Sequence, residues 1–154
     1  MFIFKKIFGV GPLGVAISLI LLSLVWWIDR LFGRPSITVY STLLKAIGIL
    51  LVVIGIGIHL WALWTLRHWW IDNRLCKLGP FKYFRHPMYA AWITFIASGI
   101  SLYLNSWIFL LWPISLQPIW HRLVIQEEKI MADIFGNEYN VYAQHTGRFI
   151  PRIF

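Results

Sequence analysis

Residues 78–89 read Leu-Gly-Pro-Phe-Lys-Tyr-Phe-Arg-His-Pro-Met-Tyr, and this basic, aromatic segment lies between two long apolar runs. Gly79-Pro80 marks a turn, and Pro87 suits the first turn of a following helix, where its missing N–H costs nothing. A loop that only joins two membrane helices needs neither these charges nor four aromatic rings. We therefore expect the segment to form part of the functional site and the rest of the chain to support it.

The composition excludes an ordinary soluble domain. Of the 154 residues, 59% are hydrophobic and only 13% are charged, so there is too little polar surface to coat a globule in water. We predict an all-α, polytopic membrane protein that forms a single domain over residues 1–154. The net charge of +8 lies beside apolar runs, which favours membrane lipids over nucleic acid as its partner. The single Cys76 excludes an internal disulfide and a cysteine-cluster metal site.

Apolar runs predict where the chain crosses the membrane. At a rise of 1.5 Å per residue, roughly 20 apolar residues cross the hydrocarbon layer as a helix. The first run ends in the bulky Val25-Trp26-Trp27 with no small-residue cleavage motif, so we expect a retained helix and not a signal peptide. Residues 29–35 are expected to form the first loop. The four predicted spans cover residues of about 10–28, 38–66, 88–103 and 107–121.

Small residues and prolines predict further features of these spans. Gly48, Gly55 and Gly57 give the second span a face that another helix can approach closely. The third and fourth spans are short and joined by the uncharged residues 104–106, which predicts a tight helical hairpin. Two prolines are expected to bend the fourth span; they are Pro113 and Pro118.

The chain becomes more polar after the fourth span. A new amphipathic helix is expected to start at residues 126–129 and to stop at Gly136, because glycine favours helix C-termini. A second short helix is expected over residues 138–145.

The basic residues predict the orientation in the membrane. Eleven of the fourteen Lys and Arg residues lie in the N-terminal tail, in residues 67–85 or in residues 122–152. Four spans place these three segments on one side of the membrane. The positive-inside rule then puts both termini and the active site in the cytoplasm. The two charged clusters share a face, so they can build one site together.

The chemistry of these clusters suggests a cationic, aromatic pocket beside an acidic helical turn. Arg85 and His86 suit a carboxylate, whereas Glu127 or Glu128 suits an ammonium group or ribose hydroxyls. The aromatic rings of residues 81–89 suit a flat base or a sulfonium cation. S-adenosylmethionine has all these parts and is one candidate among several. Basic residues beside spans also serve topology and lipid binding, and aromatic residues also form interfacial belts. The five histidines lack metal-ligand spacing, so no metal site is predicted.

Several short motifs occur together in the second half of the chain. They are Gly79-Pro80-Phe81, Arg85-His86-Pro87-Met88-Tyr89, Glu127-Glu128, Phe135-Gly136-Asn137-Glu138-Tyr139, Tyr142, and Arg148 followed by Pro151. This combination, over residues 73–151, resembles the isoprenylcysteine carboxyl methyltransferase and phospholipid methyltransferase superfamily of integral membrane enzymes. The resemblance implies methyl transfer from S-adenosylmethionine to a lipophilic acceptor, which is an isoprenylcysteine-like carboxylate, a phospholipid amine or a related small molecule.

The resemblance also implies which residues form the site, from segments 73–89 and 122–152. Arg122 is expected near the methyl-accepting group as the catalytic arginine. Some cofactor contacts are expected through the backbone, at Leu75 and Cys76. The residues expected to bind the cofactor are Leu75, Cys76, Phe81, His86, Pro87, Met88, Tyr89, Glu127 and Glu128.

Two other hypotheses remain open at this point. One is a membrane reductase relative that binds NADPH in its C-terminal part, but such proteins usually carry many more than four spans. The other is a non-enzymatic membrane scaffold that keeps the motifs by descent, although the intact motifs argue against it.

Overall fold

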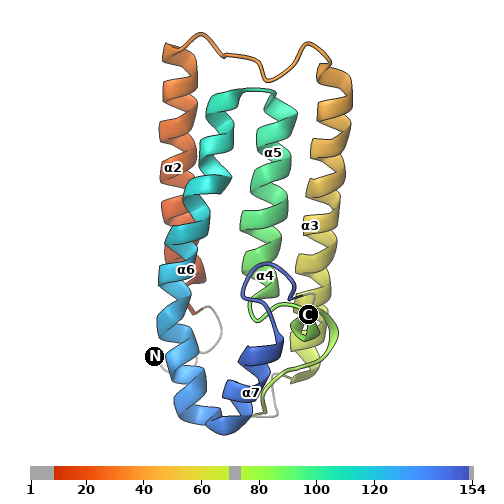
Figure 1. The fold of residues 1–154 in the computed structure, drawn as a ribbon, viewed down its shortest axis with the longest axis vertical. Helices are drawn as coiled ribbons and strands as arrows, with labels where there is room; N and C mark the ends of the chain where they lie inside the picture. The colour runs from red at the N-terminus through yellow and green to blue at the C-terminus, as the bar shows by residue number, and fades with distance from the viewer. Residues whose placement is uncertain (1–8, 70–73, 153–154) are drawn as a thin grey trace.

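The computed structural model describes residues 9–69 and 74–152, and Figure 1 shows their arrangement. The predicted all-α class is confirmed, because the described residues form helices and no strand. Lys5, Lys6 and Asn73, which the sequence placed in the basic tail and at the start of the site, lie outside these residues. The helices are α2 (Gly11–Leu31), α3 (Ser41–Trp69), a 3-10 turn η1 (Gly79–Lys82), α4 (Pro87–Ala90), a π-helical segment η2 (Ala91–Ile96), α5 (Ala97–Leu104), α6 (Trp107–Phe135) and α7 (Asn137–His145).

Four helical stretches are long and apolar enough to cross a membrane, which confirms the polytopic prediction. They are α2, the part of α3 over Ser41–Arg67, the continuous run Pro87–Leu104 formed by α4, η2 and α5, and α6. In Figure 1, α2 and α3 stand at opposite sides and the α5–α6 hairpin lies between them. α2 packs on α6, while α3 packs on η2 and α5.

Buried tryptophans join α2 to α6. Trp112 and Trp120 are fully buried. Their indole N–H groups donate to Ser18 of α2, at 2.9 Å to its carbonyl oxygen and 3.1 Å to its hydroxyl oxygen. Gly14 makes space for this contact, because a Cβ there would lie 2.4 Å from the Trp120 ring. Since no water reaches the hydrocarbon layer, these internal acceptors are what allow two tryptophans to be buried.

Glycines join α3 to the hairpin. A Cβ on Gly48 would lie 2.6 Å from the Gly99 carbonyl oxygen, and one on Gly55 would lie 3.0 Å from the Ala91 carbonyl oxygen. These distances confirm the predicted close approach at Gly48 and Gly55. The inclusion of Gly57 in this face was wrong, because a Cβ there would have no neighbour within 4 Å. Two residues turn an α-helix by about 200°, so Gly57 lies on the other side of α3 from Gly55.

This glycine contact gives a stability prediction. We expect Gly48→Ala to destabilise the bundle by about 1–3 kcal/mol, because the added methyl group must push α3 away from α5. Gly57→Ala is the matched control, since the same change in the same helix enters open space. Thermal unfolding of both variants in detergent, followed by near-ultraviolet circular dichroism, compares them. Equal unfolding midpoints would contradict the close contact.

The hairpin tip confirms one prediction and corrects another. Asn105 adopts a left-handed conformation with φ of 52°, and Ser106 caps α6, so residues 104–106 form the expected tight connection. Asp29 and Arg30 were expected in the first loop, but they belong to α2. Asp29 is only 3% exposed because its carboxylate accepts a hydrogen bond from the Ser106 hydroxyl. This bond ties the end of α2 to the hairpin tip.

The fourth span also differs from the prediction. α6 continues without interruption to Phe135, so the separate helix expected to start at residues 126–129 is instead the last part of α6. Both prolines lie inside this helix and do not end it. Its 29 residues extend about 43 Å, which exceeds a hydrocarbon layer of about 30 Å. The apolar part ends near His121, and the polar remainder projects beyond it. Gly136 ends α6 with φ of 55°, as expected.

One end of the molecule collects most of the predicted site. Figure 1 places the N-terminal end of α2, the η1 loop, α7 and the C-terminus at one end, and the hairpin tip at the other. The two charged clusters therefore share an end, as predicted. The short helix predicted over residues 138–145 is also confirmed, as α7.

Candidate functional site

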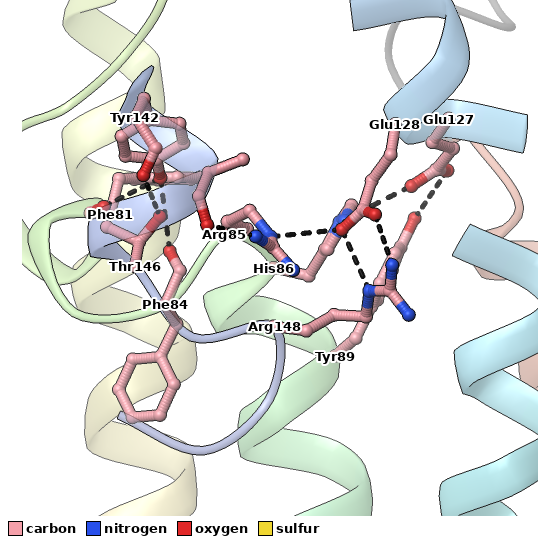
Figure 2. A network of polar contacts seen from close by, with 11 residues as sticks. Phe81, Phe84, Arg85, His86, Tyr89, Glu127, Glu128, Tyr142, Thr146 and Arg148 are labelled. Carbon is pink, nitrogen blue, oxygen red and sulfur yellow. Dashed lines mark hydrogen bonds and ion pairs between the residues drawn. The ribbon is translucent and has the colours of Figure 1, made fainter. Parts of the chain in front are cut away.

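Two carboxylates at the end of α6 meet the start of α4 (Figure 2). The imidazole ring of His86 lies between Glu127 and Glu128. Its Nδ1 is 3.5 Å from Glu127 Oε2, and its Nε2 is 3.4 Å from Glu128 Oε1. Together with Arg85 and Arg148, these side chains are only 12% to 18% exposed. We call these five residues the polar cluster.

Within the polar cluster, Glu128 is the carboxylate that the arginines neutralise. Arg148 donates to it from both Nε, at 2.9 Å, and Nη2, and Arg85 Nε lies 3.0 Å from Oε1. Burial raises the pKa of Glu128, but the adjacent His86 ring, hydrogen bonds from Arg148 and the charges of both arginines outweigh it and lower the pKa to about 2. Glu128 is therefore ionised at neutral pH, and the two arginines balance its negative charge.

Glu127 has a different set of partners. Its Oε1 accepts hydrogen bonds from the Tyr89 hydroxyl at 3.1 Å and from the Val10 backbone N–H at 2.5 Å. Among the described residues, no lysine or arginine lies within ion-pair distance of it. The start of α2 therefore completes this side of the site. Glycine suits position 9, because its φ is +47° and a Cβ would lie 1.8 Å from Glu127 Oε1 and displace that carboxylate.

Aromatic rings surround His86 on the bundle side. The rings of His86 and Tyr89 stack with centroids 5.5 Å apart and planes 10° from parallel. Phe149 lies 6.1 Å from His86, and Trp120 lies 4.7 Å from Tyr89, both measured between ring centroids. The aromatic side chains expected at the site thus lie beside the basic residues of the polar cluster.

The C-terminal tail runs alongside the loop that carries Arg85. The Gly147 carbonyl accepts from the Arg85 backbone N–H at 2.7 Å, and the Gly147 N–H donates to the Tyr83 carbonyl at 3.3 Å. The Arg148 carbonyl accepts from the His86 backbone N–H at 3.3 Å. These contacts bring Arg148 to Glu128, so the polar cluster exists only when the tail lies on the loop.

Tyr142 of α7 fixes the other end of this loop. Its hydroxyl donates to the Phe81 carbonyl at 2.7 Å. Burial raises the pKa of Tyr142, so its hydroxyl stays protonated and keeps donating at neutral pH. Leu75 is buried in a small core with Tyr139 and Tyr142. Cys76 is half-buried, and burial raises the pKa of its thiol.

The structure divides the predicted site residues into two groups. Those that meet around the polar cluster are His86, Tyr89, Glu127 and Glu128, and Pro87 is buried and Met88 half-buried beside them in the first turn of α4. Leu75, Cys76 and Phe81 lie in or near the loop under α7, where Phe81 contributes its backbone carbonyl. Arg122 is exposed on α6 and joins no ion pair among the described residues.

Several residues at the site have roles that the sequence did not predict. Arg85 was expected to hold a carboxylate of the ligand, but in the structure it pairs with Glu128, and Arg148, which was quoted only as part of a motif, joins it there when the tail folds back. Gly9 and Val10 gave a weaker signal, since the only hint was a Gly-Val-Gly-Pro sequence before the first apolar run. Among the described residues there is no group of three or more His, Cys, Asp or Glu side chains arranged to hold a metal.

Comparison with known families identifies the chain. A family model described as phospholipid methyltransferase matches residues 43–138, which is more than half of the chain. The match extends from α3 into α7 and includes His86, Tyr89 and both glutamates of the polar cluster. Neither a curated protein nor a solved structure matches this chain. The chain therefore belongs to the phospholipid methyltransferase family, part of the isoprenylcysteine carboxyl methyltransferase-like superfamily, and is an integral membrane methyltransferase.

Proposed function

We propose that this methyltransferase uses S-adenosylmethionine as methyl donor and that residues 74–89 and 122–152 bind it, with the start of α2. The observation that supports this proposal most directly is that the two glutamates have different charged partners. Glu128 is neutralised by two arginines, whereas the partners of Glu127 among residues 9–69 and 74–152 are the Tyr89 hydroxyl, the Val10 N–H and His86. A shielded carboxylate beside aromatic rings favours a cationic ligand. We infer that Glu127 binds the ligand and that Glu128 holds the two arginines of the site in place.

The residues present fit this cofactor. Arg85 Nε and His86 Nε2 are buried and make no hydrogen bond of regular geometry with the described residues, although both lie close to Glu128. Buried nitrogen atoms whose hydrogen bonds are poorly formed favour a polar ligand that completes them. Tyr89 and Phe149 offer ring faces beside them. Bound S-adenosylmethionine supplies an electrophilic methyl group on a sulfonium sulfur.

The contribution of the chain is to bind, align and exclude water. The Glu127 carboxylate holds the positive charge of the ligand close to His86. The Tyr89 hydroxyl donates to this carboxylate and fixes its position. Trp120 and Tyr89 close the bundle side of the site. Alignment of two reactants in a dry site is the main requirement for a direct methyl transfer.

The acceptor we propose is a phospholipid amine, since the family is described by phospholipid methylation. Arg122 is exposed at the end of the apolar part of α6, where a lipid phosphate is within reach of a guanidinium group. We propose that this end of the molecule faces the cytoplasm, supported by the basic residues gathered there. We also propose that the whole chain acts as one methyltransferase domain.

A binding titration tests the donor. Calorimetry in detergent is expected to give saturable binding of S-adenosylmethionine and S-adenosylhomocysteine to the wild type. His86→Ala and Glu127→Gln are each expected to weaken both by about tenfold or more, because each removes one charged or hydrogen-bonding partner. Glu138→Gln is the control, since Glu138 is half-exposed and pairs with Lys77 at the surface.

Other outcomes would reject the proposal. Binding of NADPH without either adenosyl ligand would favour a reductase, and no binding of any of the three by folded protein would favour a scaffold. Unchanged affinity in both variants would mean that the cofactor lies elsewhere.

A further inference from the structure

A cavity lies at the opposite end of the molecule from the polar cluster. Its volume is about 600 Å³, and its walls come from the last turns of α2, the connection to α3 and the hairpin tip. Phe109 lines it, and between Phe109 and Glu127 α6 rises by about 27 Å at 1.5 Å per residue. This rise is close to the thickness of a hydrocarbon layer, about 30 Å. The cavity therefore lies at the membrane surface opposite the polar cluster.

The cavity has an apolar wall and an aromatic rim. Leu22 of α2 and Ile100 and Leu104 of α5 are among the residues that line it. Trp26 and Trp27 also line it and remain half-exposed, as tryptophans at membrane interfaces usually do. Its volume lies within the range of small-molecule sites in proteins. These features suit an acyl chain that enters from the bilayer.

The polar side of the cavity selects for a negative group. The Asp29 carboxylate is already engaged, because Oδ1 accepts from the Ser106 hydroxyl and Oδ2 lies 3.8 Å from Arg34 Nε. The Arg34 side chain is 60% exposed, and this long contact is its single ion pair among the described residues. Most of its donors are therefore available to a ligand. A phosphate meets this requirement, whereas an ammonium group finds no accessible carboxylate here.

We propose that this cavity binds one phospholipid from the leaflet opposite the polar cluster, with its phosphate on Arg34 and an acyl chain against the apolar wall. The bound lipid is not the methyl acceptor, since about one membrane thickness separates it from Glu127. It instead fills the space between α2 and the hairpin tip, beside the Asp29–Ser106 hydrogen bond. The proposal is independent of the methyl donor.

Native mass spectrometry of the delipidated, full-length protein tests this site. Added phosphatidylglycerol is expected to give one saturable lipid per chain, and diacylglycerol with the same acyl chains is expected to bind at least about tenfold more weakly, because it lacks the phosphate. Millimolar inorganic phosphate is expected not to displace the lipid, because it cannot occupy the apolar wall. Equal binding of diacylglycerol, displacement by inorganic phosphate, or the lack of a saturable lipid would each overturn the proposal.

Variants locate the lipid. Arg34→Gly is expected to lose about tenfold or more in affinity and still to fold, because Arg34 has φ of +56°, which glycine adopts without strain. Ser23→Trp is expected to lose the lipid by filling the cavity. Lys45→Gln is the matched control, since Lys45 is an exposed cation near the same membrane surface that does not line the cavity. Equal lipid retention in all three variants would place the lipid elsewhere.

Discussion

Glu128→Gln is expected to destabilise the protein by about 3 kcal/mol, because it leaves two largely buried arginines without their counter-charge. Glutamine keeps the size of the side chain, so the loss reports charge and not volume. The pairs are mostly shielded from solvent, which limits screening by salt. Thermal unfolding in detergent, read at neutral pH, measures the loss. Glu138→Gln serves as the control again, since exposed pairs contribute at most about 1 kcal/mol.

The stabilisation that Glu128 provides is expected to depend on pH, and to be lost at low pH. The pKa of Glu128 falls from 4.5 to about 2 on folding, so its contribution is fully present above pH 4.5. The contribution is lost as the pH falls from 4.5 through about 2, because the carboxyl is then protonated in both the folded and the unfolded state. The wild type is therefore expected to lose stability more steeply than Glu128→Gln between these values. If stability falls equally with pH in the wild type and in Glu128→Gln, or if the two have the same unfolding midpoint at neutral pH, the ion pairs of Glu128 with the arginines do not stabilise the fold.

Gly147→Ala is expected to reduce methyl transfer by about 100-fold or more, although the four spans still fold. A Cβ at this position would lie 1.6 Å from the Ile150 carbonyl oxygen, which is backbone and cannot turn aside. The tail must then move off the Arg85 loop, and Arg148 moves with it away from Glu128. A displacement of about 1 Å in a catalytic site costs on the order of 100-fold in rate.

Two measurements separate this local effect from unfolding. Transfer of labelled methyl groups to phosphatidylethanolamine vesicles gives the rate, and far-ultraviolet circular dichroism gives the helix content. Gly57→Ala is the control, because the same change there meets no neighbour within 4 Å. A Gly147→Ala enzyme with wild-type rate would show that the tail need not lie on the loop.

The fold was predictable wherever a local pattern determines it. Apolar runs marked four spans, and Asn105 between two of them marked a tight turn. Asp29 was misplaced because an acidic residue beside a span resembles a loop residue, and its hydrogen-bond donor Ser106 lies 77 residues away in the sequence. The continuation of α6 was missed because polarity changes near Arg122, whereas the backbone hydrogen bonds of a helix do not depend on the polarity of its side chains.

The sequence predicted which residues meet at the site, but it did not predict the separate roles of the two glutamates. Motifs in the sequence brought His86 together with both glutamates, and the structure places them in contact. Nothing in an adjacent pair of glutamates shows which one the arginines will neutralise. That difference depends on where a helix turn points each side chain and on Arg148 returning from the tail. The role of Gly9 depends likewise on a contact between opposite ends of the chain.

The placement of α2 and α3 at opposite sides of the hairpin has a consequence for biosynthesis. The ribosome completes both helices before residue 87, yet each packs mainly on elements that are made afterwards. While synthesis continues, Ser18 and the close-contact glycines of α3 face lipid instead of their partners. Insertion of the hairpin between two helices already in the bilayer is then the step that creates the tertiary structure. A nascent chain that ends before the hairpin contains half the spans and almost none of the fold.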